Sequence, residues 1–180
     1  MRVISGKFKG RKIEGYDIEG TRPTQDRVKE SLFAMIQNEL IGARVLDLFT
    51  GSGNLGIEAL SNGADTVYFV DNNPKCIETV NRNLKNIDKD NLKILNLDYK
   101  AALKYFKNNN IKFDIIFLDP PYNLNCLDFC LEKIIECDIL EENGIIICEY
   151  EFDNFKESYT NLKLHKDKKY GYKNIKMYKK

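Results

Sequence analysis

The sequence contains no long hydrophobic segment. No stretch approaches the roughly 20 consecutive apolar residues that a membrane-spanning helix requires. The first residues are basic and lack the apolar core of a secretory signal peptide. We therefore expect a cytoplasmic protein with no membrane segment, and its 180 residues suffice for one compact domain with its own core.

The cysteines lack the pattern of a disulfide framework or a metal site. There are five of them, an odd number, and they lie within segments that have helical or strand periodicity. Cys126 and Cys130 are four residues apart, but no histidine and no second cysteine pair lies at zinc-site spacing from them. The sequence thus predicts reduced, buried thiols and no metal.

Charge is distributed unevenly, although the net charge is only +1. Residues 1–29 contain 8 Lys and Arg against 4 Asp and Glu, and residues 161–180 contain 8 Lys against 1 Asp. Residues 30–160 carry 12 basic against 22 acidic side chains. Two basic ends predict a surface for a polyanion if they meet in space, but a solvated tail and hairpin would give the same pattern.

Apolar periodicity predicts the order of the elements. We expect two short strands around a basic turn in residues 2–13, and a helix within residues 21–40. Strands and helices then alternate. The strands are expected at 44–49, 66–71, 92–98, 113–119 and 144–151, and the helices at 54–64, 74–87, 99–108 and 126–137. Two further strand-like segments, 161–170 and 174–180, lie on either side of Gly171.

This order predicts an α/β fold with an open, mostly parallel seven-stranded sheet covered by helices on both faces. The last two strands are joined too tightly for a crossover, so they should add an antiparallel edge. There is no internal repeat and no long linker. We divide the chain into an N-terminal basic β-hairpin extension, residues 1–21, and a main domain, residues 22–180.

A glycine-rich segment follows the first strand of the main domain. The segment "VLDLFTGSGNLG" places Gly51, Gly53 and Gly56 in a G-x-G-x-x-G frame, and Asp71 ends the next strand. The glycines let the backbone turn sharply and approach a ligand, while the acid can accept both ribose hydroxyls. Any adenosine-bearing cofactor, NAD included, suits these features.

Two features favour S-adenosylmethionine over NAD. Asp47 lies inside the strand, where a carboxylate can hold a cationic amino group, directly or through the loop. S-adenosylmethionine carries such a group and NAD does not. In addition, "FLDPPY", residues 117–122, ends a buried strand with a rigid, acceptor-rich corner for which hydride transfer has no evident use. The methyl-donor interpretation depends on these motifs occurring together.

Ligands of open parallel sheets bind beyond the carboxyl ends of the strands. The loop at 50–54, Asp71, Asp98 and Asp119 all occupy such ends, so we expect them to converge. Asp98 could accept a hydrogen bond from an adenine amine or instead cap the following helix. The predicted cofactor-binding residues are Asp47, Phe49, Thr50, Gly51, Ser52, Gly53, Asp71, Asn72 and Asp98.

The segment "DPPY", residues 119–122, suits methyl transfer to an exocyclic base amine. Such an amine is a poor nucleophile because its lone pair is delocalised into the ring. Asp119 and the Pro120 carbonyl can accept its two N–H groups and aim the lone pair, while Pro120 and Pro121 keep the loop rigid. Tyr122 can stack on the base, a contact worth about 1–3 kcal/mol. The base must be unpaired or flipped out to reach this corner.

Several segments along almost the whole chain resemble one family. In order, "RVISGKFKGRKI", "RPTQDRVKESLF", "VLDLFTGSGNLGIEALSNGA", "FVDNNP", "DPPY" and a late "YG" resemble the RsmD-type bacterial 16S rRNA (guanine-N2)-methyltransferases. The resemblance implies a class I, Rossmann-like methyltransferase fold with a small N-terminal hairpin. It also implies S-adenosylmethionine as donor and a guanine of 16S rRNA, in an assembled 30S subunit, as substrate. Arg22 and Thr24 would then lie near the entrance of the active site, with Thr24 as a further cofactor-binding residue.

The basic N-terminal residues agree with an RNA partner, because they could track phosphates with strong salt dependence. The candidates are Arg2, Lys7, Lys9, Arg11, Lys12 and Arg22. Beside the favoured rRNA guanine-N2 methyltransferase, two alternatives stay open. One is a DNA adenine-N6 methyltransferase, for which 180 residues leave little room for a target-recognition domain. The other is an NAD-type oxidoreductase or nucleotide-binding module. We expect a monomer.

Overall fold

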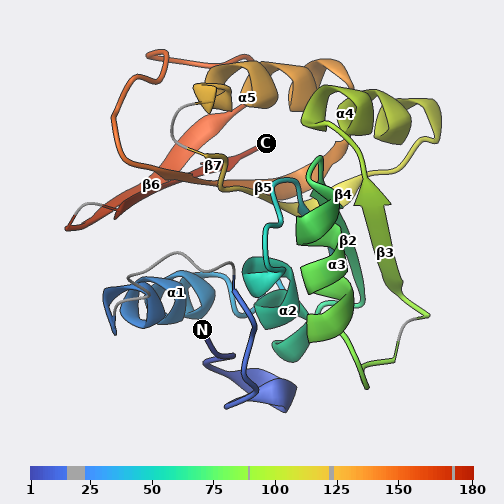
Figure 1. The fold of residues 1–180 in the computed structure, drawn as a ribbon. Helices are drawn as coiled ribbons and strands as arrows, with labels where there is room; N and C mark the ends of the chain where they lie inside the picture. The colour runs from blue at the N-terminus through green and yellow to red at the C-terminus, as the bar shows by residue number, and fades with distance from the viewer. Residues whose placement is uncertain (16–22, 89, 122–123, 172) are drawn as a thin grey trace.

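The computed structural model describes residues 1–15, 23–88, 90–121, 124–171 and 173–180, and the side chains of residues 23–25 also lie outside its description. Its centre is a seven-stranded sheet in the order β3-β2-β1-β4-β5-β7-β6 (Figure 1). β1 to β5 are parallel, and β7 is antiparallel to both β5 and β6. The strands are β1 (Arg44–Asp47), β2 (Thr66–Asp71), β3 (Leu92–Asn96), β4 (Phe113–Leu118), β5 (Leu140–Tyr150), β6 (Lys163–Tyr170) and β7 (Lys173–Lys179). The predicted fold class and antiparallel edge are confirmed.

Helices cover both faces of the sheet (Figure 1). α1 (Pro23–Met35), α2 (Asn54–Ser61) and α3 (Pro74–Asn83) pack on one face, and α4 (Tyr99–Asn108) and α5 (Leu127–Glu136) on the other. Phe117 belongs to the first apolar cluster and Ile116 to the second, because successive strand side chains point to opposite faces. Among the described residues, no helix has the length and apolar character needed to cross a bilayer.

The strand order places a switch point at the centre of the sheet. β1 is followed in sequence by β2 and β3 on one side, whereas β4 and β5 extend the sheet on the other. β1 and β4 are parallel neighbours, with Asp47 opposite Phe117. Their carboxyl ends therefore lie side by side, which is where open α/β sheets form a ligand crevice.

The N-terminal segment differs from the two strands that we predicted. The structure has a single antiparallel bridge, Arg2 to Lys12, and a short 3-10 helix, η1 (Gly6–Phe8). Antiparallel pairing is present but short, because Val3 N donates to Arg11 O, Gly10 N to Val3 O and Ile13 N to Met1 O. Beyond Val3 the N–H groups of Ile4 and Ser5 donate instead to the Glu58 carboxylate of α2. Residues 1–15 thus form a strap on α2, while the proposed division at residues 21 and 22 stays a prediction.

Local signals predicted the helix starts well. Asn73 caps α3 through its side chain, which accepts from Lys75 N at 3.0 Å, and Pro74 occupies the first turn, as predicted. The bounds of α4 match the predicted helix at 99–108.

β5 begins at Leu140, earlier than predicted, and passes through Gly144. Cys126, Cys130 and Cys148 are buried thiols.

Candidate active site

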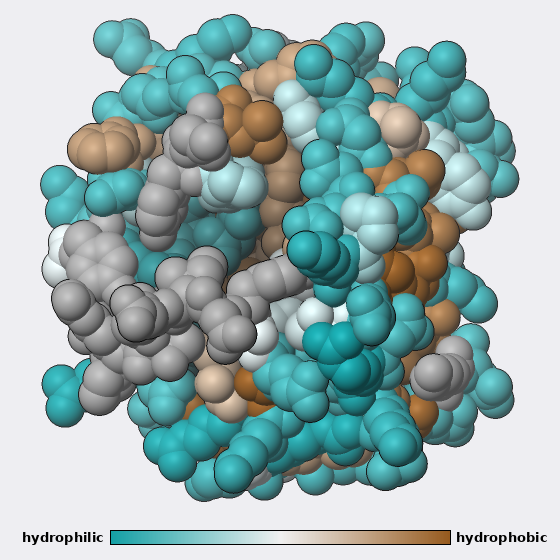
Figure 2. Space-filling model, in the orientation of Figure 1, coloured by the Kyte–Doolittle hydropathy of each residue, from teal (hydrophilic) through white to brown (hydrophobic). Residues whose placement is uncertain are grey.

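A cavity of about 680 Å³ opens at the carboxyl ends of the central strands. Its lining includes residues 49–52 after β1, Asp71 and Asn72 after β2, Asp98 after β3, and residues 119–121 after β4. Figure 2 shows a mostly hydrophilic face that is hollowed near its centre, with apolar surface inside the hollow. The strand ends therefore converge as predicted, in a cavity of the size that small-molecule sites have.

The glycine loop is shaped by residues without a side chain. Gly51 (φ 52°) and Gly53 (φ 82°) have left-handed backbones, and Gly53 is the N-cap of α2. The Gly51 N–H donates to Asp71 Oδ2 at 2.9 Å, which ties the loop to the end of β2. A Cβ on Gly56 would lie 2.3 Å from the Phe69 ring, so α2 packs directly on β2 only because residue 56 is glycine.

The Asp47 side chain holds the glycine loop in place through hydrogen bonds. Its side chain is only 1 % exposed, and Oδ2 accepts from the Thr50 hydroxyl and from the Gly56 N–H, each at 2.9 Å. Burial raises the pKa of Asp47 to about 7, and the nearby Asp119 and Asp71 add to the rise. Within the described part of the chain, no cationic side chain pairs with Asp47, so a cationic ligand would stabilise its charged form.

The other predicted acids also have structural partners. Asp71 accepts from Gly51 N and from Asn73 N, one bond on each carboxylate oxygen, and each oxygen keeps a second lone pair. Asp98 is the N-cap of α4 and accepts from Lys100 N at 2.9 Å, so the capping role is observed. Asp98 nevertheless lines the cavity, beside the rings of Phe49 and Tyr99, which contact each other at a tilt of 42° with centroids 5.5 Å apart.

Asp119 follows β4 and faces the cavity, with Pro120 buried behind it. Burial raises the pKa of Asp119, and the positive charge of Lys173 acts in the opposite direction. The Pro121 carbonyl accepts from Leu124 N at 2.9 Å. Tyr122, Arg22 and the side chain of Thr24 lie outside the described residues, so their roles stay predictions.

Our sequence analysis missed Glu149 and Lys173, which also line this cavity. Glu149, near the end of β5, and Lys173, the first residue of β7, form an ion pair whose side chains are 13 % and 15 % exposed. A carboxylate at the end of a buried strand was the signal that identified Asp71 and Asp119. The same signal applied to β5 would have found Glu149.

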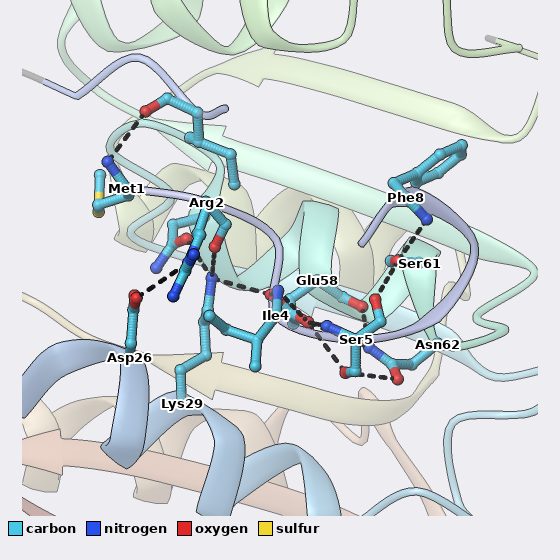
Figure 3. Close-up of polar contacts among 12 residues, drawn as sticks. Met1, Arg2, Ile4, Ser5, Phe8, Asp26, Lys29, Glu58, Ser61 and Asn62 are labelled. Carbon is cyan, nitrogen blue, oxygen red and sulfur yellow. Dashed lines mark hydrogen bonds and ion pairs between the residues drawn. The ribbon is translucent and has the colours of Figure 1, made fainter. Parts of the chain in front are cut away.

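A second missed cluster joins the strap to α1 and α2 (Figure 3). Lys29 of α1 forms an ion pair with Glu58 at 2.8 Å, and both side chains are buried. The Lys29 ammonium also donates to the Arg2 carbonyl at 2.6 Å and to Asn54 Oδ1 at 2.8 Å. Because Asn54 follows Gly53 directly, this cluster connects the N-terminal strap with the glycine loop, and Lys29 itself lines the cavity.

The predicted RNA-binding residues fall into two groups. The Arg11 guanidinium donates to the carbonyls of Asn83 and Lys85, so it anchors the strap to the end of α3. Arg2 is exposed but forms an ion pair with Asp26 at 3.3 Å. The remaining described candidates, Lys7, Lys9 and Lys12, are exposed, and within the described residues they form no ion pair.

Comparison with known proteins gives matches over the full length. The family model "Conserved hypothetical protein 95" matches residues 1–179. The putative rRNA methyltransferase YlbH of Bacillus subtilis is 42% identical over 182 residues, which cover 100% of this chain and 99% of the relative. Ribosomal RNA small subunit methyltransferase D of Haemophilus influenzae is 33% identical, covering 99% of this chain and 93% of the relative.

Solved structures agree with this assignment. The putative methyltransferase yhhF from Escherichia coli matches with a TM-score of 0.86 at 27% identity, covering 100% of this chain and 97% of the other. A putative methyltransferase complexed with SAH shares the fold, with a TM-score of 0.69 at 19% identity over 82% of this chain and 49% of the other. The chain belongs to the family described as conserved hypothetical protein 95, the RsmD family of methyltransferases.

Proposed function

We propose that the protein transfers a methyl group from S-adenosylmethionine to the exocyclic N2 amine of a guanine in small-subunit 16S rRNA. One observation carries the proposal: the acceptor corner at Asp119 and Pro120 shares a single cavity with the glycine loop and Asp71. The relatives named ribosomal RNA small subunit methyltransferase D, at 33% and 30% identity, support the reaction class and the RNA substrate.

The cavity fits S-adenosylmethionine, which supplies an electrophilic methyl group when bound. A Cβ on Gly51 would meet no atom within 4 Å, so the loop backbone faces open space. Asp71 retains acceptor capacity for a ribose diol, and the Phe49 and Tyr99 rings offer an apolar wall for adenine. Asp47 is a buried carboxylate whose charged form a cationic ligand would stabilise.

Asp119 and Pro120 act on the target amine. The carboxylate and the carbonyl accept its two N–H groups, which fixes the nitrogen and directs its lone pair toward the methyl group. As the N–CH₃ bond forms and the S–CH₃ bond breaks, the nitrogen loses one proton. Burial raises the pKa of Asp119, and a carboxylate with a raised pKa is the better acceptor for that proton.

The RNA side of the proposal depends on the strap. Lys7, Lys9 and Lys12 are exposed on residues 1–15 and can contact phosphates. The guanine must leave its helix to reach Asp119, and Tyr122 would stack on it. We propose that the substrate is the assembled 30S subunit, and that the protein acts as a monomer in the cytoplasm.

Labelled S-adenosylmethionine tests this proposal directly. Unmodified 30S particles, naked 16S rRNA and duplex DNA are offered side by side, and the labelled nucleoside is identified after digestion. We expect N2-methylguanosine from the particles and no label with Asp119→Ala. N6-methyladenine in DNA would move the substrate to the alternative methyltransferase. If calorimetry shows that the protein binds NAD and does not bind S-adenosylmethionine, the assignment of S-adenosylmethionine as the donor is wrong.

A further inference from the structure

The ion pair between Glu149 and Lys173 has no part in the chemistry described so far. Its two side chains are 13 % and 15 % exposed, and both face the cavity with Asp119 and Pro120. Removing two charges from water is costly, and apolar residues of similar volume often stabilise a fold as well or better. A nearly buried pair on the wall of a cavity therefore points to a ligand that uses it.

The strand register places Glu149 next to Asp119. β4 and β5 are parallel, with Leu118 opposite Cys148, so Asp119 and Glu149 are the next residues on two strands about 4.8 Å apart. Leu118 and Cys148 belong to the apolar cluster under α4 and α5. Because side chains alternate, Asp119 and Glu149 point to the opposite face, toward α1.

Lys173 completes the row from the next strand. β7 is antiparallel to β5, with Ile175 opposite Glu149, so Lys173 begins β7 at the edge where β4 and β5 end. Ile175 belongs to the apolar cluster on the α1 face, and Lys173, two residues earlier, has the same orientation. The charge of Lys173 also acts on Asp119, in agreement with their places at the same edge of the sheet.

The row still has bonding capacity. Lys173 Nζ donates to Glu149 Oε1, and within the described part of the chain it makes no other hydrogen bond. Glu149 Oε2 likewise accepts none from the described residues. A base that enters the cavity therefore meets, in order, the two acceptors of Asp119 and Pro120, one carboxylate acceptor and one ammonium donor.

We propose that Glu149 and Lys173 read the Watson–Crick edge of the target guanine. That edge presents the N2 amine, the N1–H donor and the O6 acceptor in sequence. With the N2 amine on Asp119 and Pro120, Glu149 accepts from N1–H and Lys173 donates to O6. The inference rests on the proposed function and names the residues that select guanine within it.

The same row rejects adenine. If the adenine N6 amine occupied Asp119 and Pro120, the neighbouring ring N1 would turn a lone pair toward the Glu149 carboxylate. The Glu149 oxygen that is not bonded to Lys173 would then face an acceptor instead of a donor in a nearly buried site. Sites built to hydrogen-bond a substrate group reject analogues that lack it by as much as about 10⁴–10⁵.

A base analogue separates edge reading from general damage. After the methylated guanine has been located with wild-type protein, 30S particles are assembled with 2-aminopurine at that position. 2-Aminopurine keeps the amine but has an acceptor at N1 and no O6. We expect wild-type protein to prefer guanine by about 100-fold or more in kcat/KM, since 2-aminopurine loses both the N1–H and the O6 pairing.

Two variants then test which protein group pairs with N1 and which with O6. Glu149→Gln should lower guanine turnover about 30-fold and raise 2-aminopurine turnover, because the amide can donate to N1. Lys173→Met should lower guanine turnover far more than 2-aminopurine turnover, because the analogue has no O6. Affinity for S-adenosylmethionine, measured by calorimetry, should stay within about 3-fold for both.

The matched control is Lys133→Met, which removes an exposed ion pair with Glu136 on α5 and should leave the guanine preference unchanged. If Glu149→Gln and Lys173→Met each lower the turnover of guanine and of 2-aminopurine by the same factor, the pair is structural and the inference is wrong. If wild-type protein uses 2-aminopurine as well as guanine, the inference fails while the proposed function stands. Absence of N2-methylguanosine with wild-type protein overturns the proposed function itself. If Glu149→Gln does not fold, Lys173→Met and the wild-type comparison still decide.

Discussion

Three carboxylates at the cavity have different surroundings, and these surroundings give them different roles. Asp47 is buried and bonded to the loop, Asp71 is bonded to backbone N–H groups at the end of β2, and Asp119 faces the cavity after β4. The three carboxylates therefore differ in burial and in free acceptor capacity, although each stands at or near a strand end. Substitutions should affect binding and transfer separately.

Asp119→Ala should reduce methyl transfer at least about 10²–10³-fold, because the amine loses the acceptor that orients it. Affinity for S-adenosylmethionine should stay near that of the wild type, since Asp119 lies in the part of the cavity that we assign to the target base. Asp71→Ala should instead weaken the donor by about tenfold or more, because the loop and the ribose both depend on it. Single-turnover rates and calorimetry make the comparison, and exchanged phenotypes would contradict the assigned roles.

Asp47 should make stability depend on pH. Its pKa rises from 3.8 to about 7 on folding because it is buried, so the folded protein holds this proton more tightly. The stabilisation is complete below about pH 4 and is lost as the pH rises toward 7, on the order of 4 kcal/mol in all. Urea unfolding of wild type and Asp47→Asn between pH 4 and 8 measures it.

As the pH rises from 4 to 8, the unfolding free energy of the wild type should fall relative to that of Asp47→Asn. Saturating S-adenosylmethionine should reduce the shift, because its positive charge stabilises the ionised carboxylate. A difference that is constant across the pH range would contradict the raised pKa.

At the scale of elements, the cavity depends on two close contacts of α2. The Lys29–Glu58 pair holds α1 and the strap against α2, and Gly56 lets α2 pack directly on β2. Both contacts lie within a few residues of the glycine loop. Changes in either should therefore reach donor binding as well as stability.

Lys29→Met should destabilise the protein by about 3–5 kcal/mol, because it leaves the Glu58 carboxylate buried without its cation. The double variant Lys29→Met/Glu58→Gln should recover part of that loss, since the uncompensated charge is gone. Urea denaturation gives the values. The exposed pair of Lys133 and Glu136 is the control, and an equal effect of Lys133→Met would refute the special role of the buried pair.

Gly56→Ala should cost about 1–3 kcal/mol, because the added Cβ would lie 2.3 Å from the Phe69 ring. Phe69→Leu in the same chain should restore part of the stability by making room. Gly15→Ala is the control, because its Cβ would meet only the flexible end of Met1 at 3.2 Å. Thermal unfolding distinguishes them, and equal effects of the two alanines would rule out the clash.

For the whole molecule, charge distribution determines how RNA approaches. The strap lies on the α1–α3 side of the sheet, whereas Lys104 and Lys107 of α4 lie on the opposite side (Figure 1). Arg11 is engaged within the fold, so the strap offers Lys7, Lys9 and Lys12. These lysines should supply phosphate contacts on the side from which α1 and the strap border the cavity.

Replacing Lys7, Lys9 and Lys12 by glutamine should weaken RNA binding and lower the slope of log affinity against log salt by about 2, at roughly 0.7 to 0.9 per lost contact. Affinity for S-adenosylmethionine should not change. Filter binding at several salt concentrations measures the slope. Lys104→Gln/Lys107→Gln is the control, and a similar drop in that variant would mean that the binding is not directed to the strap.

Patterns within the amino-acid sequence were sufficient to predict the order of elements, the α/β class, the glycine loop and the acceptor corner. These features depend on local causes: apolar periodicity, caps such as Asn73, and glycine or proline at fixed positions. Asp71, Asp98 and Asp119 could be assigned to one cavity because the carboxyl ends of parallel strands meet at one edge of a sheet.

Which polar residues meet across long stretches of sequence depends on how the elements pack. Lys29 and Glu58 are buried together although they lie 29 positions apart in the sequence, and Glu149 meets Lys173 only because β7 inserts between β5 and β6. The pairing of the strap stops after Val3 and a 3-10 helix follows, because the N–H groups of Ile4 and Ser5 donate to a carboxylate on α2. Such partners are selected by packing and desolvation in three dimensions, and no local pattern encodes them.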